Sequence, residues 1–234
     1  VVVFHPTSKD TIKVVAGTGG RTDRDLGLRL VERGFICICP ENFIYEQDSW
    51  QASVAEARKR HPDSTGMATM LADGLRATDV LLTLTGVDPE RIGSAGHSLG
   101  AKESLYHTAF DDRVKAGISS EGGIPLDASN WYAEWYLGAQ IKKPDFGHDH
   151  HELLALIAPR PFLIFGGETG RAADGNRTWP YVVAANELSR QLGHTPGIGF
   201  INHGEDHSFS LPQVEKALDW MEAWLVRSSS KIDR

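Results

Sequence analysis

Cysteine is scarce in this sequence, with two residues, Cys37 and Cys39, among 234. They stand two positions apart in a strand-like run, so their side chains would point the same way and a disulfide between them would be strained. This spacing argues against a mutual disulfide and leaves the redox compartment open.

Long hydrophobic runs are also lacking. No apolar stretch approaches the roughly 20 residues that a membrane-spanning helix needs, and the N-terminus has neither the charged start nor the small-residue cleavage site of a signal peptide. We therefore expect a soluble chain. It begins at Val1 without Met, directly in a strand-like run, so we expect a further segment to precede it. Any export signal would lie there, and the compartment stays open.

Positive charge is not in excess. Lys and Arg number 24 against 31 Asp and Glu, and the net charge is -7. Without a basic field the chain is poorly suited to bind nucleic acid or an acidic membrane surface. We expect a small-molecule partner, and the sequence does not indicate an oligomeric state.

What the sequence does contain is an alternation of strand-length apolar runs with helical patterns. This predicts one α/β domain over residues 1–234, with a mostly parallel, twisted sheet covered by helices on both faces. The expected strands are Val1–Phe4, Thr11–Val15, Phe35–Cys39, Ile92–Ala95, Val114–Ser119, Pro161–Phe165 and Ile198–Asn202. The expected helices are Leu26–Glu32, Met67–Thr85, Leu99–Phe110, His150–Ile157, Tyr181–Leu192 and Leu211–Val226.

Two long segments interrupt the alternation. Glu41–Gly66 is polar and predicts a solvated helix or loop. Gly122–Asp149 is rich in aromatic residues and follows an expected strand. Because loops after the carboxyl ends of parallel strands form the binding crevice of such sheets, this segment is a candidate wall or lid, about residues 122–149. The alternative is a local hydrophobic cluster beneath a long loop.

The stretch GHSLG places Ser98 between Gly96 and Gly100. The apolar run Ile92–Ala95 precedes it and a helical pattern follows, and strand, sharp turn, helix is the setting of a nucleophile elbow. The glycines have a steric reason, since a Cβ at either position would crowd the strand or the helix. Ser98 is therefore a candidate nucleophile.

A serine hydroxyl needs a base, and the base needs an acid that orients it. His207, in the loop after the last expected strand, is the preferred base, with His203 in the same loop as the alternative. The order serine, acid, histidine along the chain is typical of α/β-hydrolases. Asp174, in the loop after the penultimate expected strand, is the preferred acid over Glu168. Glu121, at the end of the strand that follows the elbow helix, is the alternative acid.

Two backbone N–H groups are expected to hold an oxyanion. One is that of Leu99, directly after Ser98. The other is expected from the glycine-rich loop Ala16–Gly20, which follows the expected strand Thr11–Val15, and Thr18 is preferred. This loop lacks the third glycine of a dinucleotide fingerprint and the lysine of a P-loop, so no nucleotide is expected.

The cluster His148–His151 has residue types that bind metals. However, Asp149 and Glu152 stand before an apolar helical pattern with the spacing of a capping box. We therefore expect no metal site.

Four groups of residues together resemble a known family. They are Gly17–Gly20, DPERIG at 88–93 with GHSLG at 96–100, HHELLALIAPRP at 150–161, and NHG at 202–204 with HSF at 207–209. Over nearly the whole chain they resemble the dienelactone-hydrolase-like branch of the α/β-hydrolases. More narrowly, they are similar to bacterial carbohydrate esterases of the acetyl-xylan and glucuronoyl type.

This resemblance implies the α/β-hydrolase fold, with at least one early strand of its eight-stranded sheet absent from this sequence. It also implies ester hydrolysis without a cofactor, with Ser98 and His207 as nucleophile and base. Glucuronoyl esterases carry a lysine where Lys102 stands, and some take their acid at a spacing like that of Glu121. Leu99 departs from that branch, which has an arginine there, and this argues against a uronate ester.

The combined expectation is a serine esterase for carboxylic esters, with carbohydrate-linked esters as a candidate substrate class. Lys102, Trp131, Trp135 and Trp179 are the expected substrate-binding residues. The alternatives are a peptidase or C–C hydrolase of the same fold, or a non-catalytic ligand-binding member.

Overall fold

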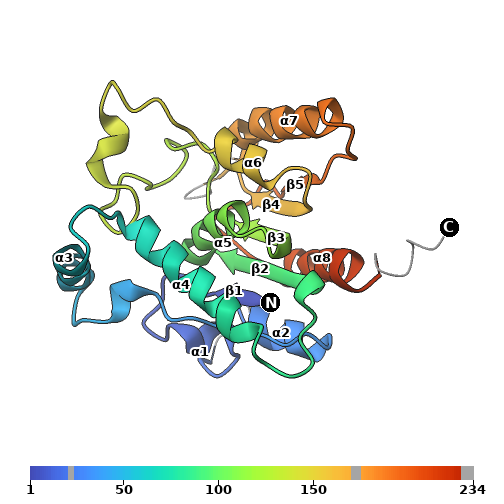
Figure 1. Cartoon of the computed structure of the whole chain (residues 1–234), viewed down its shortest axis with the longest axis horizontal. Helices are drawn as coiled ribbons and strands as arrows, with labels where there is room; N and C mark the ends of the chain where they lie inside the picture. Colours follow the sequence, from blue (N-terminus) through green and yellow to red (C-terminus); the bar gives the residue numbers. More distant parts are fainter. Residues whose placement is uncertain (21–23, 170–174, 228–234) are drawn as a thin grey trace.

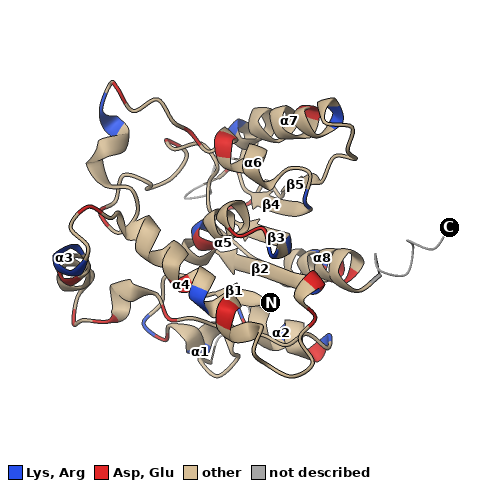
Figure 2. Ribbon diagram, in the orientation of Figure 1, with Lys and Arg blue, Asp and Glu red and all other residues tan. Residues whose placement is uncertain are grey.

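Five apolar runs form one parallel sheet in the computed structural model, which describes residues 1–20, 24–169 and 175–227 (Figure 1). The strands lie in chain order across the sheet, each paired with the next. They are β1 (Val2–Phe4), β2 (Ile92–His97), β3 (Val114–Ser120), β4 (Phe162–Gly166) and β5 (Ile198–Asn202). Lys115 is the one charged residue among them, as expected for strands buried on both faces. Figure 2 accordingly shows acidic and basic residues mainly on helices and loops.

The register brings the carboxyl ends of the strands together. Phe4 pairs with Gly96, His97 with Ser120, and Gly166 with Asn202. The residues that follow these strands therefore meet at one edge of the sheet, which is where open α/β sheets bind ligands.

Eight α-helices flank the sheet in the described part of the chain. They are α1 (Ile12–Val15), α2 (Leu26–Glu32), α3 (Trp50–Arg60), α4 (Gly66–Leu81), α5 (Leu99–Phe110), α6 (His151–Ile157), α7 (Gly175–Gln191) and α8 (Leu211–Glu222). Short 3₁₀ turns lie at Phe43–Tyr45, Pro89–Arg91 and Gly138–Lys142, and a π turn at Ala223–Arg227 follows α8. None of the described helices combines the length and apolar character that a bilayer crossing requires.

Alternation along the strands divides the core into two layers. In β4, Phe162 and Ile164 pack in a cluster with residues of α4 to α7, whereas Leu163 and Phe165 pack in a cluster with α2 and α8. Successive side chains of a strand point to opposite faces, so one run supplies both layers. This confirms the predicted sheet with helices on both sides.

The expected strand Thr11–Val15 is wrong, because Ile12–Val15 forms helix α1. The backbone turns helically there, with the Lys13 N–H donating to the Asp10 carbonyl at 2.9 Å. The place beside β1 is taken by the expected strand Phe35–Cys39. This β-branched and apolar run does not form a full strand. It makes one isolated β-bridge, between Ile38 and Val2.

The other elements agree more closely with the bounds predicted from the sequence. Leu26–Glu32 and Leu99–Phe110 are helices with the predicted bounds. Within the polar segment 41–66 the chain forms a 3₁₀ turn and then α3, whose N-terminus is capped by the Ser49 hydroxyl, which accepts from the Ala52 N–H. Segment 122–149 is irregular apart from one 3₁₀ turn.

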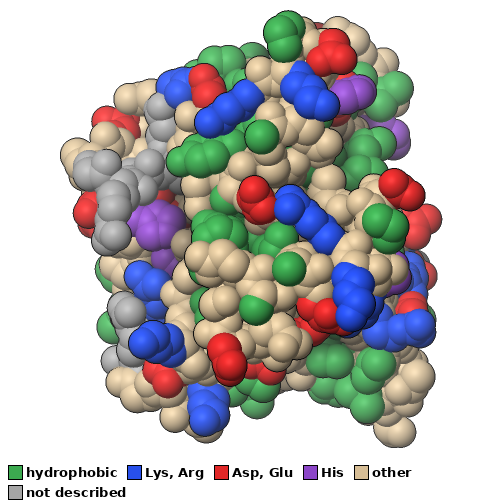
Figure 3. All heavy atoms as spheres, turned by 90° about the vertical axis from the view of Figure 1, so that its left-hand side faces the viewer, with side chains coloured by type: hydrophobic (Ala, Val, Ile, Leu, Met, Phe, Trp, Pro, Cys, Tyr) green, Lys and Arg blue, Asp and Glu red, His purple; other side chains and the backbone are tan. Residues whose placement is uncertain are grey.

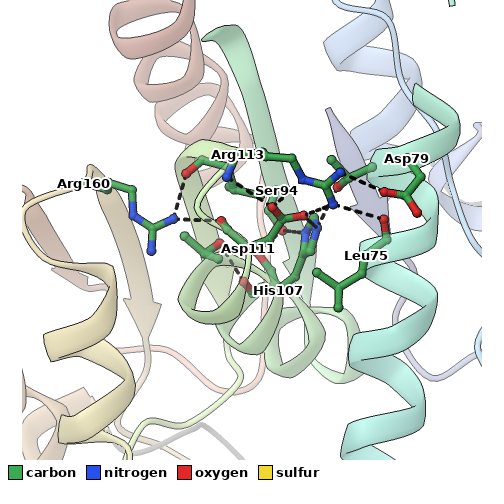
Figure 4. Close-up of polar contacts among 11 residues, drawn as sticks. Leu75, Asp79, Ser94, His107, Asp111, Arg113 and Arg160 are labelled. Atoms are coloured by element: carbon green, nitrogen blue, oxygen red, sulfur yellow. Dashed lines mark hydrogen bonds and ion pairs between the residues drawn. The ribbon is translucent and has the colours of Figure 1, made fainter. Parts of the chain in front are cut away.

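A buried polar network holds the far end of α5 (Figure 4). The His107 ring contacts Thr78 Oγ1 at 2.9 Å and Ser94 Oγ at 3.1 Å, which joins α5 to α4 and β2. The Asp111 carboxylate accepts two bonds of 2.8 Å from the Arg113 guanidinium. The same guanidinium reaches the Asp79 carboxylate on α4 at 2.8 Å.

Arg160 closes this network from the segment before β4. Its Nη1 donates to the backbone carbonyls of Asp111 and Val114, at 2.9 Å each. The end of α5 and the start of β3 are thereby tied together, which fixes the helix that begins directly after Ser98.

Candidate active site

The turn between β2 and α5 has the geometry of a nucleophile elbow. Ser98 has φ 60° and ψ -114°, in the left-handed half of backbone space. A Cβ on Gly96 would lie 2.2 Å from the Gly100 carbonyl oxygen, and one on Gly100 would lie 2.3 Å from that of Phe4. Only glycine fits at both positions, so the sharp turn that presents Ser98 depends on them.

His207 lies beside Ser98, in the loop between β5 and α8. Its Nε2 is 2.8 Å from Ser98 Oγ, and its Nδ1 is 3.2 Å from Glu121 Oε2. A neutral ring with hydrogen on Nδ1 donates to the carboxylate and accepts from the serine hydroxyl. The alternative base, His203, instead contacts Glu121 Oε1 through Nε2 at 2.7 Å.

Glu121 directly follows β3 and its side chain is fully buried. Its φ is 60°, and its N–H donates to the Phe165 carbonyl at 3.0 Å. The structure thus brings the alternative acid onto His207. The preferred acid, Asp174, lies outside the described residues, and Glu168 contacts the Asn202 side chain.

A second imidazole supports the ring of His207. His97, at the end of β2, lies 5.1 Å from it between ring centroids and stacks on Phe209 at 5.5 Å. Burial, with the charge of His207 next in weight, holds the pKa of His97 well below its ordinary value. His97 is therefore a neutral ring that packs against His207, and it does not act as a second proton carrier.

Lys102 is buried one helical turn after Ser98. Its Nζ donates to the Gly122 carbonyl at 2.6 Å and to Ser129 Oγ at 2.8 Å. The ammonium also lies 4.9 Å from the ring centroid of Trp131. Burial lowers the pKa of Lys102 to about 7, while the charge of Glu121 acts in the opposite direction.

Ser98 and His207 open into a cavity of about 580 Å³. Lys102, Arg24 and Asn130 line it with them. A polar wall of this kind suits a ligand with several hydroxyl or carbonyl groups.

An adjoining cavity of about 520 Å³ has aromatic walls. Tyr45, Trp50 and Trp135 line it, and the Trp50 and Trp135 rings meet edge to face at 4.6 Å. Thr7 and Asn130 line both cavities, so the two are neighbours. The face formed by α3 and segment 122–149 is seen directly in Figure 3, where hydrophobic side chains are interspersed with charged ones.

The four expected substrate-binding residues separate in the structure. Lys102 lines the Ser98 cavity and Trp135 the adjoining one. Trp131 is fully buried, and its indole N–H donates to the Gly123 carbonyl at 3.0 Å. Its ring packs against the Lys102 ammonium and does not line the cavity. Trp179, on α7, is 54% exposed and packs on Phe200, and it is not among the described residues that line either cavity.

Thr18 does not line the Ser98 cavity. Its N–H donates to the Lys13 carbonyl at 2.9 Å, within the turn that ends α1. That expectation depended on the strand that proved to be a helix. Thr7 is the residue from a loop after an early strand that does line the cavity. It follows β1, the strand paired with β2. Leu99 begins α5 directly after Ser98, as expected.

Several residues at the site escaped sequence reasoning. Arg24, Tyr45 and Trp50 carry no local signal of their own, because their approach depends on how distant loops pack. Thr7 could have been found, since it lies in the loop directly after the first strand and that strand was predicted.

The cluster 148–151 is occupied by protein contacts. His148 contacts Glu152 at 2.9 Å, His150 contacts the Ile124 carbonyl at 2.7 Å, and Asp149 Oδ1 accepts from the His150 N–H. Within the described ranges no three His, Cys, Asp or Glu side chains are grouped so as to hold a metal ion.

The parallel sheet, the elbow after β2 and the histidine after β5 together are those of an α/β-hydrolase fold. The profile of the dienelactone hydrolase family matches residues 2–147, and the chain belongs to this family.

Several relatives are similar to parts of the chain. Carbohydrate esterase MZ0003, from an unknown prokaryotic organism, is 28% identical over 134 residues, which is 50% of this chain and 31% of that protein. The 4-O-methyl-glucuronoyl methylesterase 1 of Sodiomyces alcalophilus is 27% identical over 168 residues, 60% of this chain and 34% of that protein. This chain thus spans about a third of the length of the curated relatives it matches.

A solved structure supports the fold. The carbohydrate esterase family 15 glucuronoyl esterase of Caldicellulosiruptor kristjansonii superposes with a TM-score of 0.70 at 20% identity. The match covers 97% of this chain and 68% of that one.

Proposed function

We propose that this chain is the catalytic domain of a serine esterase that hydrolyses carboxylic esters through an acyl-enzyme. The observation that carries the proposal is the chain of contacts from Ser98 Oγ to His207 Nε2 at 2.8 Å, and from His207 Nδ1 to Glu121 Oε2 at 3.2 Å. Membership of the dienelactone hydrolase family supports it.

In this mechanism Ser98 Oγ attacks the ester carbonyl carbon while His207 Nε2 accepts its proton. Glu121, a buried carboxylate, stabilises the imidazolium that forms. The imidazolium then protonates the departing alcohol, and a water molecule activated by His207 cleaves the acyl-enzyme.

The oxyanion is held by backbone N–H groups in the proposed mechanism. That of Leu99 lies at the start of α5, where the helix dipole favours negative charge. Thr7 supplies the second, since it follows the strand next to β2 and lines the same cavity.

The substrate class we propose is an ester of a carbohydrate. The polar wall formed by Lys102, Arg24 and Asn130 offers donors and acceptors to a hydroxylated group. The printed names of MZ0003 and of the Sodiomyces relative, a carbohydrate esterase and a glucuronoyl methylesterase, support the same class.

The test compares hydrolysis of p-nitrophenyl acetate by the wild type, Ser98→Ala and Ser64→Ala. Removing the nucleophile should lower kcat by at least about 1,000-fold. Ser64→Ala, in the loop between α3 and α4, is a control and should keep the wild-type rate. Hydrolysis that survives Ser98→Ala would contradict the mechanism.

The substrate class is tested with a methyl uronate, an acetylated xylo-oligosaccharide and p-nitrophenyl acetate. A carbohydrate ester should show the higher kcat/KM. A clear preference for the simple acetate would contradict the class while leaving the mechanism intact.

A further inference from the structure

Two imidazole rings, not one, meet the buried carboxylate of Glu121. His207 contacts Oε2 at 3.2 Å, and His203 contacts Oε1 at the shorter distance of 2.7 Å. The His203 side chain is 5% exposed and that of Glu121 is fully buried. The shorter of these two contacts is therefore made by His203, whereas His207 is the histidine that contacts Ser98.

The hydrogen on His203 can be placed from its second contact. The Glu205 backbone N–H is directed at His203 Nδ1, at 3.3 Å. Because Nδ1 must offer a lone pair to this donor, the ring hydrogen is on Nε2 and points to Glu121 Oε1. His203 is then a fixed donor to the carboxylate.

Backbone contacts hold the loop that carries both histidines. The His203 N–H donates to the Gly166 carbonyl at 3.0 Å, and the Glu205 carbonyl accepts from the N–H groups of Glu168 and Thr169 at 3.1 and 3.3 Å. The loop is thus tied to the end of β4. His203 and His207 reach Glu121 from a segment with little freedom to move apart.

A carboxylate can rotate about its last side-chain bond and present either oxygen to a given donor. With Oε1 held by His203, Oε2 remains directed at His207 Nδ1. We propose that His203 is a positioning residue, which holds Glu121 in the orientation that aligns His207 with Ser98. This inference rests on the proposed function and assigns a residue to it beyond the catalytic three.

The charges around Glu121 suit a neutral His203 ring as the donor to its carboxylate. The charge of Glu121 already acts on Lys102, and the neutral ring of His97 lies beside His207. A neutral N–H on Oε1 orients the carboxylate without cancelling the negative charge that stabilises the His207 imidazolium.

The first test separates hydrogen bonding from packing. His203→Phe keeps a ring and removes the donor, whereas His203→Gln keeps an N–H at similar reach. With p-nitrophenyl acetate, Phe should lower kcat by about 10–100-fold with KM within about twofold, and Gln should retain kcat within about fivefold. Wild-type kcat in the Phe variant, equal losses in both variants, or a loss confined to KM would each overturn the proposal.

The second test is a double-mutant cycle with Glu121→Gln. If His203 acts through Glu121, then adding His203→Phe to Glu121→Gln should lower kcat by less than about threefold further. A full additional 10-fold loss would overturn the proposal. Should His203→Phe not fold in a thermal melt, His203→Leu takes its place in both tests, since it also lacks a donor.

Two controls separate this inference from the proposed function. His194→Phe, on the exposed turn before β5, should leave kcat unchanged. Ser98→Ala and His207→Gln test the mechanism itself, so their retention of activity would contradict the proposed function. Loss of activity in these two with none in His203→Phe would overturn only the role of His203.

Discussion

Ser98 and Glu121 share an unusual backbone conformation, with φ of 60° at both. For residues other than glycine this conformation costs on the order of 1 kcal/mol or more and persists only where the surroundings enforce it. Here the enforcing contacts include the Ser98 N–H to the Ser120 carbonyl, at 2.7 Å, and the Glu121 N–H to the Phe165 carbonyl. Both side chains are thereby directed to the same edge of the sheet, where His207 joins them.

This geometry leads to a prediction about the acid. Glu121→Gln should lower kcat by about 1,000- to 10,000-fold, because an amide cannot stabilise the imidazolium and can favour the wrong ring tautomer. Asp174→Asn, the matched control for the acid expected from sequence, should change kcat by less than about threefold. Steady-state kinetics on p-nitrophenyl acetate measure both, and the reverse order of effects would reject Glu121 as the acid.

At the scale of elements, helix α5 is held at both ends. Its first residue follows the elbow, and its last turn is tied to α4, β2 and β3 by the network around His107, Asp111 and Arg160 (Figure 4). A helix anchored in this way keeps Ser98 in register with the strand ends. Burial raises the pKa of Asp111, but hydrogen bonds from His107 and Arg113 outweigh it and leave the pKa well below its ordinary value.

The lowered pKa of Asp111 implies a pH-dependent contribution to stability. A carboxylate of this kind stabilises the fold above its unfolded pKa of about 3.9 and loses that contribution as pH falls toward the folded value. Asp111→Asn should therefore lower the free energy of unfolding by about 2–4 kcal/mol at pH 7, since it breaks a buried ion pair.

The difference from wild type should shrink by about 1 kcal/mol at pH 3, where the unfolded carboxyl is largely protonated. Urea unfolding of the two proteins at pH 7 and pH 3 measures this change. An equal penalty at both pH values would show that Asp111 does not act through its charge.

At the scale of the whole molecule, the ligand-binding region is assembled from distant segments. The aromatic cavity joins Tyr45 and Trp50, around the start of α3, to Trp135 in segment 122–149. Partly buried contacts at its C-terminal end fasten that segment to the body. Tyr181 Oη donates to the Asp149 carboxylate, and the ring of His150, the next residue, contacts Tyr106 Oη at 3.0 Å. We therefore propose that the segment is a fixed wall of the cavity.

The position of Trp50 predicts selectivity by size. Trp50→Ala should raise KM about 5- to 10-fold for esters that carry a large ring group, because one aromatic face of the adjoining cavity is lost. It should leave p-nitrophenyl acetate within about twofold, since a small acyl group stays near Ser98. Trp224→Ala, after α8, is the matched control. An equal effect of Trp50→Ala on both substrates would show that the cavity does not contact the ester.

Much of this organisation could be read from local sequence patterns. The alternation of apolar runs predicted all five strands of the sheet, and the glycines around Ser98 predicted the elbow. These signals are local because strand pleat, helix periodicity and steric crowding act between residues close in the chain. The same reasoning was wrong at Thr11–Val15, because Ile12–Val15 forms α1 and the residue bridged to β1 is Ile38, from the expected strand Phe35–Cys39.

The sequence by itself determined the class of fold, the elbow serine and the loop that supplies the histidine. Only the tertiary structure decided that Glu121 lies against His207, that His203 holds the other carboxylate oxygen, and that Thr7 rather than Thr18 lines the cavity. The physical reason is that several carboxylates and amides satisfy the local pattern equally well. Which of them meet depends on strand order and register, because only these bring the ends of β1, β2, β3 and β5 to one edge of the sheet.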